Sequence, residues 1–220
     1  MPRAELLTAL LLGLARGLCA FGSTSETWLG GTQPWDSVPY YELNAGLHAT
    51  GGDGQPGLGP FLEWGILDQL MLAGSWDQPF SGAEGSGDVL LKIREAEMPR
   101  WRPALGAYLR SGFGAEAVAA RPGLILAIEP WDASLVANAE SGPQGLGWRF
   151  AGWTPYVVSF LRLGFEATQP APGQAWRLWP QITLQAPGDL SAVLGAQTLS
   201  DGSGRWAWAA HLSYELFPSP

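Results

Sequence analysis

Several residue types are scarce in this chain of 220 residues, which has one cysteine, two histidines and a single lysine, Lys92. One cysteine, Cys19, excludes an internal disulfide, and so few Cys and His residues cannot form a zinc cluster of the usual kind. A formal net charge of −8 argues against a nucleic-acid partner. A soluble surface normally carries many lysines, which this chain lacks. Because Cys and His are so scarce, we expect no metal; we also expect no cofactor.

Long apolar runs are also missing after the N-terminus, so no transmembrane helix is predicted there. The N-terminus itself has Arg3, an apolar run over residues 6–15 and small residues near Ala20. This pattern predicts a signal peptide over residues 1–22, with a short amphipathic helix as the alternative. Residues 23–39 are rich in Gly, Ser, Thr and Pro and predict an irregular leader.

The clearest pattern is the alternation of residues 205–216, which predicts a strand with two different faces. One face is apolar: Trp206, Trp208, Ala210, Leu212, Tyr214 and Leu216. The other face is more polar: Arg205, Ala207, Ala209, His211, Ser213 and Glu215.

Similar alternation recurs from residue 40 to residue 217, without any alternation of strands and helices. It predicts an all-β domain of about twelve strands, with ten as the alternative count. The expected strands span residues 40–49, 59–67, 70–77, 88–95, 104–113, 124–129, 133–140, 147–153, 156–167, 175–185, 190–199 and 205–216. Longer Gly-rich connections (50–58, 78–87, 114–123, 141–146, 168–174 and 200–204) are expected to alternate with tight ones, as in outer-membrane barrels.

Twelve tryptophans are many for this length, and most are expected near strand ends, as in the aromatic belts of membrane proteins. We predict that seven aromatic side chains lie at a lipid interface: Trp64, Trp76, Trp148, Trp176, Trp206, Trp208 and Tyr214.

Charged residues fall on the opposite face of the expected strands. In a closed barrel this face encloses the lumen, where such charges form a structural network or set the selectivity of a pore. The predicted lumen residues are Lys92, Arg94, Arg110, Glu129, Arg162, Glu166, Arg177, His211 and Glu215. In the hairpin around residues 169–174, we expect Glu166 opposite Arg177 and Arg162 near Gln181.

Residues 59–77 and 88–112 resemble the strand–turn–strand units of Gram-negative outer-membrane β-barrel proteins of the small porin or transporter type. The resemblance covers roughly residues 40–217. It implies a closed antiparallel up-and-down transmembrane β-barrel in the bacterial outer membrane. It also implies contact with the lipid bilayer and with the outer-membrane assembly machinery, and passage of small solutes.

The first functional hypothesis is a narrow passive channel or small-solute transporter. A closed structural or adhesion-type barrel is the alternative, and a soluble secreted β-sheet protein is a further one. The chain is not expected to be an enzyme, apart from a lipid hydrolase that would use His211 and Ser213. Residues two apart on a strand lie about 7 Å from each other, too far for a direct hydrogen bond, which disfavours that hydrolase.

Overall fold

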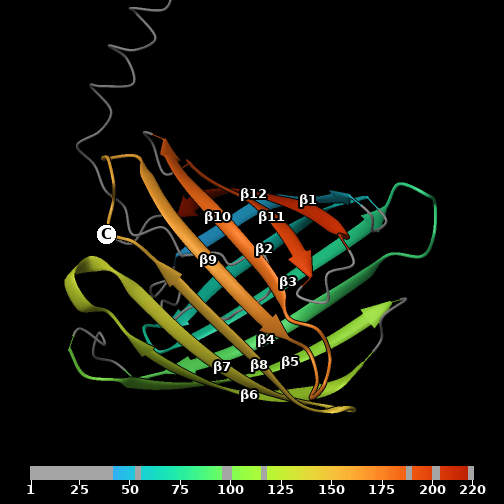
Figure 1. Ribbon diagram of the computed structural model, residues 1–220, viewed down its shortest axis with the longest axis horizontal. Helices are drawn as coiled ribbons and strands as arrows, with labels where there is room; N and C mark the ends of the chain where they lie inside the picture. The colour runs from blue at the N-terminus through green and yellow to red at the C-terminus, as the bar shows by residue number, and fades with distance from the viewer. Residues whose placement is uncertain are drawn as a thin grey trace, which may run out of the picture.

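The computed structural model describes residues 42–52, 56–95, 101–114, 118–186, 190–199 and 204–217. These residues form twelve strands and one 3-10 turn (Figure 1). The strands are β1 (Leu43–Gly52), β2 (Gly57–Leu67), β3 (Leu70–Pro79), β4 (Ser86–Arg94), β5 (Ala104–Gly114), β6 (Val118–Ile128), β7 (Ser134–Gly142), β8 (Gly145–Trp153), β9 (Leu161–Gln169), β10 (Arg177–Ala186), β11 (Leu190–Leu199) and β12 (Trp206–Phe217); the 3-10 turn is Pro130–Asp132. The predicted signal peptide (1–22) and leader (23–39) lie outside the described residues.

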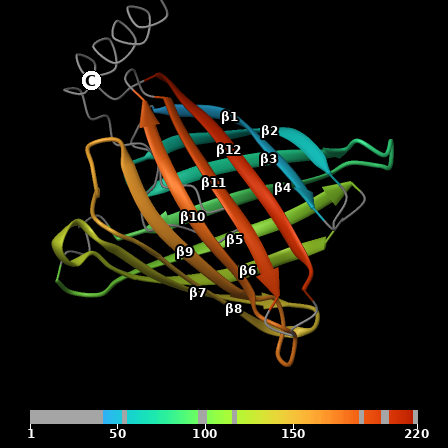
Figure 2. The same ribbon diagram turned by 45° about the horizontal axis from the view of Figure 1, so that its top comes forward.

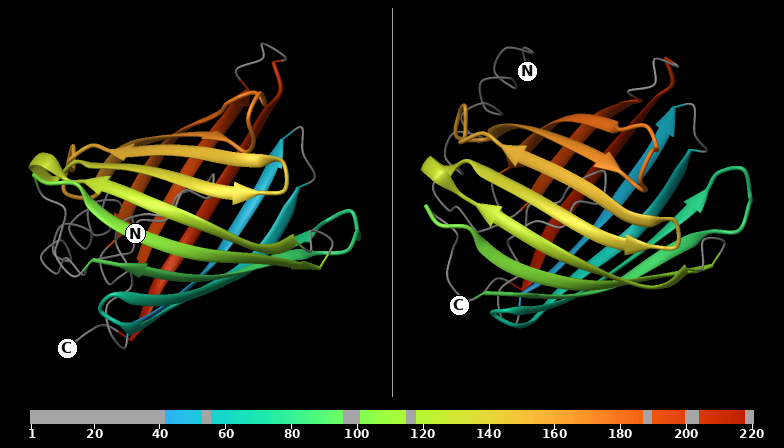
Figure 3. Two further views of the ribbon diagram at one scale, coloured as in Figure 1. Left: turned by 90° about the horizontal axis from the view of Figure 1, so that it is seen from below. Right: turned by 60° about the horizontal axis from the view of Figure 1, so that its bottom comes forward.

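The twelve strands form one closed antiparallel barrel in which each strand pairs with its neighbours in the chain and β12 pairs with β1. The closing pair runs from Leu43 opposite Phe217 to Gly52 opposite Ala207. Figures 2 and 3 show β9–β12 crossing the barrel on the opposite side from β4 and β5. The predicted fold class and the count of twelve strands are confirmed. We call the rim where β1 begins and β12 ends the terminal end, and the opposite rim the distal end.

Side chains alternate across the barrel wall as the sequence predicts. On β12, Trp206 and Tyr214 are 54% and 47% exposed on the outside, whereas Ala209 and Glu215 are buried on the inside. On β4, Leu91 points outward and Lys92 inward. The outside of the wall is therefore apolar along its strands, because the period-two pattern places one residue type on each face.

The inside of the wall is not uniformly polar. One buried apolar cluster lies on the inward face of β3–β7, towards the terminal end. Its members are Met71, Leu90, Ala104, Tyr108, Ile125, Ala127 and Val136. The sequence pattern predicted charges inside, but it did not predict this apolar lining.

Aromatic rings on both faces lie over glycines of the neighbouring strand. Trp153 on β8 pairs with Gly164 on β9, and a Cβ added to Gly164 would lie 2.1 Å from the Trp153 ring. The same arrangement joins Tyr108 to Gly123, Phe61 to Gly46, Phe113 to Gly87 and Trp208 to Gly51. Because glycine has no side chain, each bulky ring can pack directly against the backbone of the neighbouring strand. Trp153 is 3% exposed and faces inward, so this tryptophan near a strand end is an exception to the outer aromatic belt expected for most of them.

Three strands contain proline within their length, and β3 ends in Pro79; proline cannot donate a ladder hydrogen bond. Each proline keeps a partner on one side only. Pro60 pairs with Leu47, Pro122 with Leu109 and Pro180 with Phe165. On the opposite side, Pro60 and Pro180 fall in gaps of the β2–β3 and β10–β11 pairing, and Pro122 precedes the start of the β6–β7 pairing. Proline is tolerated in these strands because the missing N–H falls where no neighbour would accept it.

Two sequence expectations about strand limits are wrong. β9 begins at Leu161 and not at residue 156, and its nine residues make it shorter than the twelve of β12. β6 begins at Val118, inside the expected loop 114–123. The connections also do not alternate in length, because residues 143–144 form a two-residue turn at the distal end while residues 95–103 form a long connection at the terminal end.

The contact between Trp153 and Gly164 leads to a stability prediction. Gly164→Ala forces the buried ring away from the backbone, and we expect it to lower the free energy of unfolding by about 1–3 kcal/mol. Gly74→Ala is the matched control, because a Cβ there meets its nearest atom at 3.7 Å. Urea unfolding of the folded barrel in lipid vesicles measures both variants. Equal stability of the two would contradict the tight packing of Trp153 on Gly164.

Candidate functional site in the lumen

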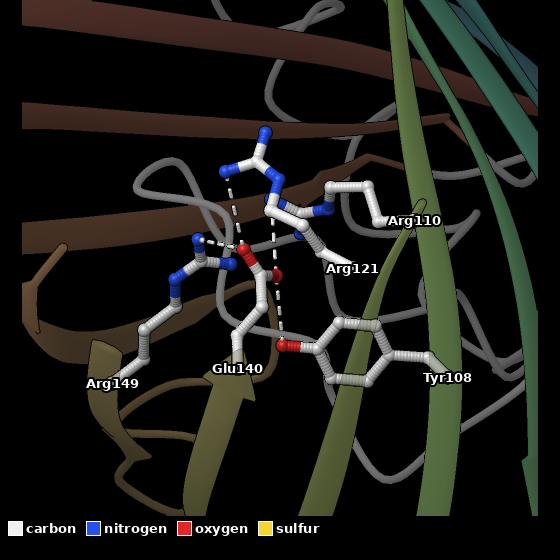
Figure 4. A network of polar contacts seen from close by, with 5 residues as sticks. All are labelled: Tyr108, Arg110, Arg121, Glu140 and Arg149. Atoms are coloured by element: carbon white, nitrogen blue, oxygen red, sulfur yellow. Dashed lines mark hydrogen bonds and ion pairs between the residues drawn. The ribbon is translucent and has the colours of Figure 1, made fainter. Parts of the chain in front are cut away.

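Four neighbouring strands bring one carboxylate and three guanidinium groups together inside the barrel (Figure 4). Tyr108 Oη donates a hydrogen bond of 3.0 Å to Glu140 Oε2, and Arg149 Nη2 donates one of 3.2 Å to Glu140 Oε1. Arg121 Nη1 lies 3.5 Å from Glu140 Oε1, and Arg110 Nη1 lies 3.7 Å from Glu140 Oε2. We call these five residues the Glu140 network.

Strand register explains how the network forms. Tyr108 and Arg110 are two residues apart on β5, so both side chains point inward. Arg121 on β6 pairs directly with Arg110. Glu140 on β7 pairs with glycines on both sides, Gly123 and Gly147, so no neighbouring side chain separates it from the arginines. Arg121 and Glu140 lie in the distal halves of their strands, whereas Tyr108, Arg110 and Arg149 lie near mid-strand.

The network carries more positive than negative charge. Glu140 offsets one of the three guanidinium charges and the neighbouring carboxylate of Glu166 acts on Arg149, which leaves a formal excess of one positive charge. Three guanidinium groups also bring more N–H donors than one carboxylate can accept. The Glu140 side chain is 6% exposed, whereas that of Arg121 is 27% exposed. The arrangement can therefore hold its own carboxylate and still attract an anion to the exposed side of the cluster.

A second buried polar group lies beside this network on β9 and β10. Gln181 Nε2 donates a hydrogen bond of 3.1 Å to Glu166 Oε2, and Glu166 is 1% exposed. Trp179, also buried, is the direct cross-strand partner of Glu166.

Acidic residues lie on another part of the wall, near the terminal end. Asn44 on β1 pairs with Glu215 on one side and with Glu63 on the other. The wall of β12, β1 and β2 thus bears carboxylates, whereas β5, β6 and β8 bear arginines between mid-strand and the distal end. Glu63 and Glu215 therefore lie on a different part of the wall from the three arginines, although both signs of charge occur near each end: Lys92 and Arg94 lie near the terminal end and Asp77 near the distal end.

The predicted lumen residues occupy several different environments. Lys92, Glu166 and Glu215 are buried and inward, His211 lies beside His48, and Arg110 belongs to the Glu140 network. Three others lie at strand limits, where Arg94 is the last residue of β4, Glu129 follows β6, and Arg177 is the exposed first residue of β10. Arg162 Nε donates a hydrogen bond of 3.0 Å to the Thr154 carbonyl at the terminal end. A role of these residues in selectivity stays a prediction.

The expected register of the β9–β10 hairpin is wrong by two positions. Arg177 pairs with Thr168 and Trp179 pairs with Glu166, while Arg162 pairs with Thr183. β9 continues to Gln169, and Pro170 then ends the pairing because it has no N–H to donate. The shift is even, so every side chain keeps the face that the alternation predicts.

The predicted interface aromatics lie near the two ends of the strands. Trp64, Trp148, Trp206, Trp208 and Tyr214 are at least 40% exposed, and Trp76 and Trp176 are partly exposed. Trp76 stacks with Phe113 at 5.7 Å between ring centroids, and Trp176 lies 5.9 Å from Phe150. Five are near the distal end (Trp76, Trp148, Trp176, Trp206 and Trp208), and two are towards the terminal end (Trp64 and Tyr214).

Sequence reasoning missed four of the five network residues. Arg121 fell in a segment expected to be a loop, and Glu140 and Arg149 fell in weakly alternating segments. Tyr108 alternates with Ala107 and Leu109 and so falls on the polar face of its strand, but this pattern does not indicate its partner. The alternation of Gly147, Arg149 and Ala151 with apolar residues was the available signal for β8.

Among the described side chains, the contacts of His211 and Ser213 are not those of the catalytic pair that the hydrolase alternative requires. Ser213 Oγ lies 2.6 Å from Ser191 Oγ, whereas the His211 ring lies 5.3 Å from Phe61 and 5.6 Å from His48 between centroids. No helix among the described residues is long and apolar enough to cross a membrane. In the same residues, no three His, Cys, Asp or Glu side chains stand together as metal ligands.

The Glu140 network leads to a second stability prediction. Glu140→Gln removes the anion that three arginines share, so the repulsion between their positive charges is offset less. We expect the free energy of unfolding to fall by about 1–3 kcal/mol. Glu84→Gln, in the exposed β3–β4 connection, is the control for a change of the same chemistry. Urea unfolding in vesicles compares them, and an unchanged Glu140→Gln barrel would show that the network does not stabilise the fold.

Comparison with known proteins supports the architecture. No family model matches the sequence, and no curated protein matches it. Among solved structures, the chain is similar to KdgM porin with a TM-score of 0.67 at 8% identity, over 78% of this chain and 98% of that chain. KdgM porin in complex with disordered oligogalacturonate gives 0.66 at 8% identity over the same shares.

A third structure, from work on the mechanism behind the in-meso crystallization of membrane proteins, has a TM-score of 0.57 at 10% identity, over 81% of this chain and 86% of that chain. At these identities the likeness concerns the fold. The chain has the twelve-strand closed barrel fold of an outer-membrane porin.

Proposed function

We propose that this protein spans the bacterial outer membrane and acts as a narrow passive channel for small solutes, with a preference for anions. The observation that carries the proposal is the Glu140 network, in which three arginines share one carboxylate inside a closed barrel.

The outer face of the barrel supports a position in lipid. Large apolar side chains point outward on every strand that forms the wall; examples are Leu47, Leu91, Leu124 and Phe165, which are 49%, 42%, 65% and 52% exposed. Exposed tryptophans near both ends match the preference of indole for the membrane–water interface. The closed ring leaves no strand edge whose backbone groups would lack partners in lipid. Delivery to that membrane, by the signal peptide and the assembly machinery, belongs to the same proposal.

The inner face supports a channel with a charged lining. Twelve strands lie between the eight that side chains can fill and the sixteen or more that leave a wide aqueous pore. An excess of positive charge in a narrow passage lowers the energy of an anion there and raises that of a cation. Glu63 and Glu215 lie on a different part of the wall, so they do not cancel the positive charge that remains after Glu166 is counted.

The comparisons are consistent with the choice of solute. One similar structure is of KdgM porin in complex with oligogalacturonate, a solute whose sugar units carry carboxylates. We propose small carboxylate-bearing solutes as the preferred class for this chain.

A closed structural barrel is the second candidate, and one observation favours it. Several inward side chains are almost fully buried, among them Lys92 at 0%, Ile125 at 1% and Asn138 at 1% exposure. Such burial is typical of a barrel whose lumen is filled by side chains at the level of these residues.

Planar-bilayer recordings of the purified barrel distinguish the two candidates. We expect discrete conductance steps and a reversal potential in a KCl gradient that indicates anion preference. Arg121→Gln, which changes the most exposed arginine of the network, should lower the chloride-to-potassium permeability ratio several-fold. Arg102→Gln, in the exposed connection at the terminal end, removes the same charge outside the network and should change the ratio little.

The absence of conductance steps would favour the structural barrel. Steps with cation preference would contradict the anion channel, and so would an equal effect of the two arginine substitutions.

A further inference from the structure

The two histidines of the chain meet at the strand pair that closes the barrel. His48 on β1 and His211 on β12 are direct cross-strand partners, and their ring centroids lie 5.6 Å apart with a 33° angle between the ring planes. Both rings face inward. His211 Nδ1 is buried, and no hydrogen-bond partner for it exists among the described residues. A buried ring nitrogen without a partner lowers the stability of the fold, so such nitrogens usually have a hydrogen-bond or metal partner.

A carboxylate approaches the same pair across the intervening strand. Asp77 on β3 has Oδ1 4.0 Å from His48 Nε2, although β2 lies between β1 and β3. Asp77 can reach across β2 because two glycines lie between it and His48. A Cβ on Gly57 would lie 2.2 Å from Asp77 Oδ1, and Gly59 is the cross-strand partner of His48. Asp77 Oδ1 is also buried without a hydrogen-bond partner among the described residues.

Phe61 on β2 packs against the His211 ring. Its ring lies over Gly46, where an added Cβ would be 2.5 Å away, and its centroid is 5.3 Å from that of His211. Side chains from four adjacent strands, β12, β1, β2 and β3, therefore meet at this part of the inner wall. Glycines on β1 and β2 allow Phe61 and Asp77 to approach so closely.

We propose that His48 and His211 bind a transition-metal ion such as Zn²⁺, Ni²⁺ or Cu²⁺ between one ring nitrogen of each. Two imidazoles with centroids this far apart can each direct a nitrogen at an ion about 2 Å away. Asp77 then accepts a hydrogen bond from the other ring nitrogen of His48, after the 4.0 Å separation shortens by about 1 Å. A carboxylate behind a metal-ligating histidine in this way fixes the ring and strengthens the ligand.

The donor set also determines which ions fit. Imidazole nitrogens suit Zn²⁺, Ni²⁺ and Cu²⁺, whereas Ca²⁺ and Mg²⁺ require oxygen ligands. Because the described residues contain no cluster of three ligating side chains, water or a solute in the lumen completes the coordination. The site joins the first strand to the last, so a bound ion links the two strands that close the ring.

Calorimetric titration of the full-length barrel in detergent, prepared without a histidine tag, tests the site with Zn²⁺. We expect one Zn²⁺ per chain and a melting temperature that rises with Zn²⁺ concentration. His48→Ala and His211→Ala should each abolish the saturable binding, and Asp77→Asn should weaken it about 10–100-fold. Asp68→Asn, in the β2–β3 turn at the terminal end, is the matched control and should bind as the unchanged chain does.

A second measurement needs no variant. Diethyl pyrocarbonate modifies histidines, and the chain has two, so mass spectrometry can follow each one in the folded barrel. Zn²⁺ should protect both from modification, and Mg²⁺ should protect neither. Protection of one histidine alone or of neither would overturn the proposal, and so would Zn²⁺ binding that survives in the double variant His48→Ala/His211→Ala.

Discussion

The structure depends on the hydrogen bonding between β1 and β12, because this pair turns an open sheet into a ring. In a hydrocarbon environment an unpaired N–H or C=O costs several kcal/mol, and a free edge would expose a whole row of them. The register from Leu43 opposite Phe217 to Gly52 opposite Ala207 removes both edges. All other features, including the separation of apolar and polar faces, require that this closure be complete.

Steric fit determines which side chains can line the closed wall. Large rings lie over glycines inside the barrel, as Tyr108 does over Gly123, and outside it, as Trp208 does over Gly51. The glycines beside Glu140 have a related effect, because they leave a carboxylate and three arginines in reach of one another across four strands. The distribution of glycine, more than that of charge, thus decides where polar groups can gather in the lumen.

The sequence predicted the architecture well because alternation is a local property. The faces of β12 follow from Trp206, His211 and Glu215 alone, and an even register error, as at Glu166, leaves faces unchanged. The network was harder to predict. Pro122 and Gly123 indicate a loop in sequence, yet β6 passes through them because its pairing to β7 begins only at Gly123. The contacts of Glu140 depend on the registers of three strand pairs, β5–β6, β6–β7 and β7–β8. No single segment of the sequence determines all three.

Since β1 and β12 are paired along their whole length and meet at one rim, the ring itself has no preferred first strand. A chain whose original ends are joined and which is opened instead at Asp68 and Gln69, in the two-residue link between β2 and β3, would trace the same twelve strands in a rotated order. Circular permutation of this barrel would separate the role of strand order in membrane insertion from that of the finished wall.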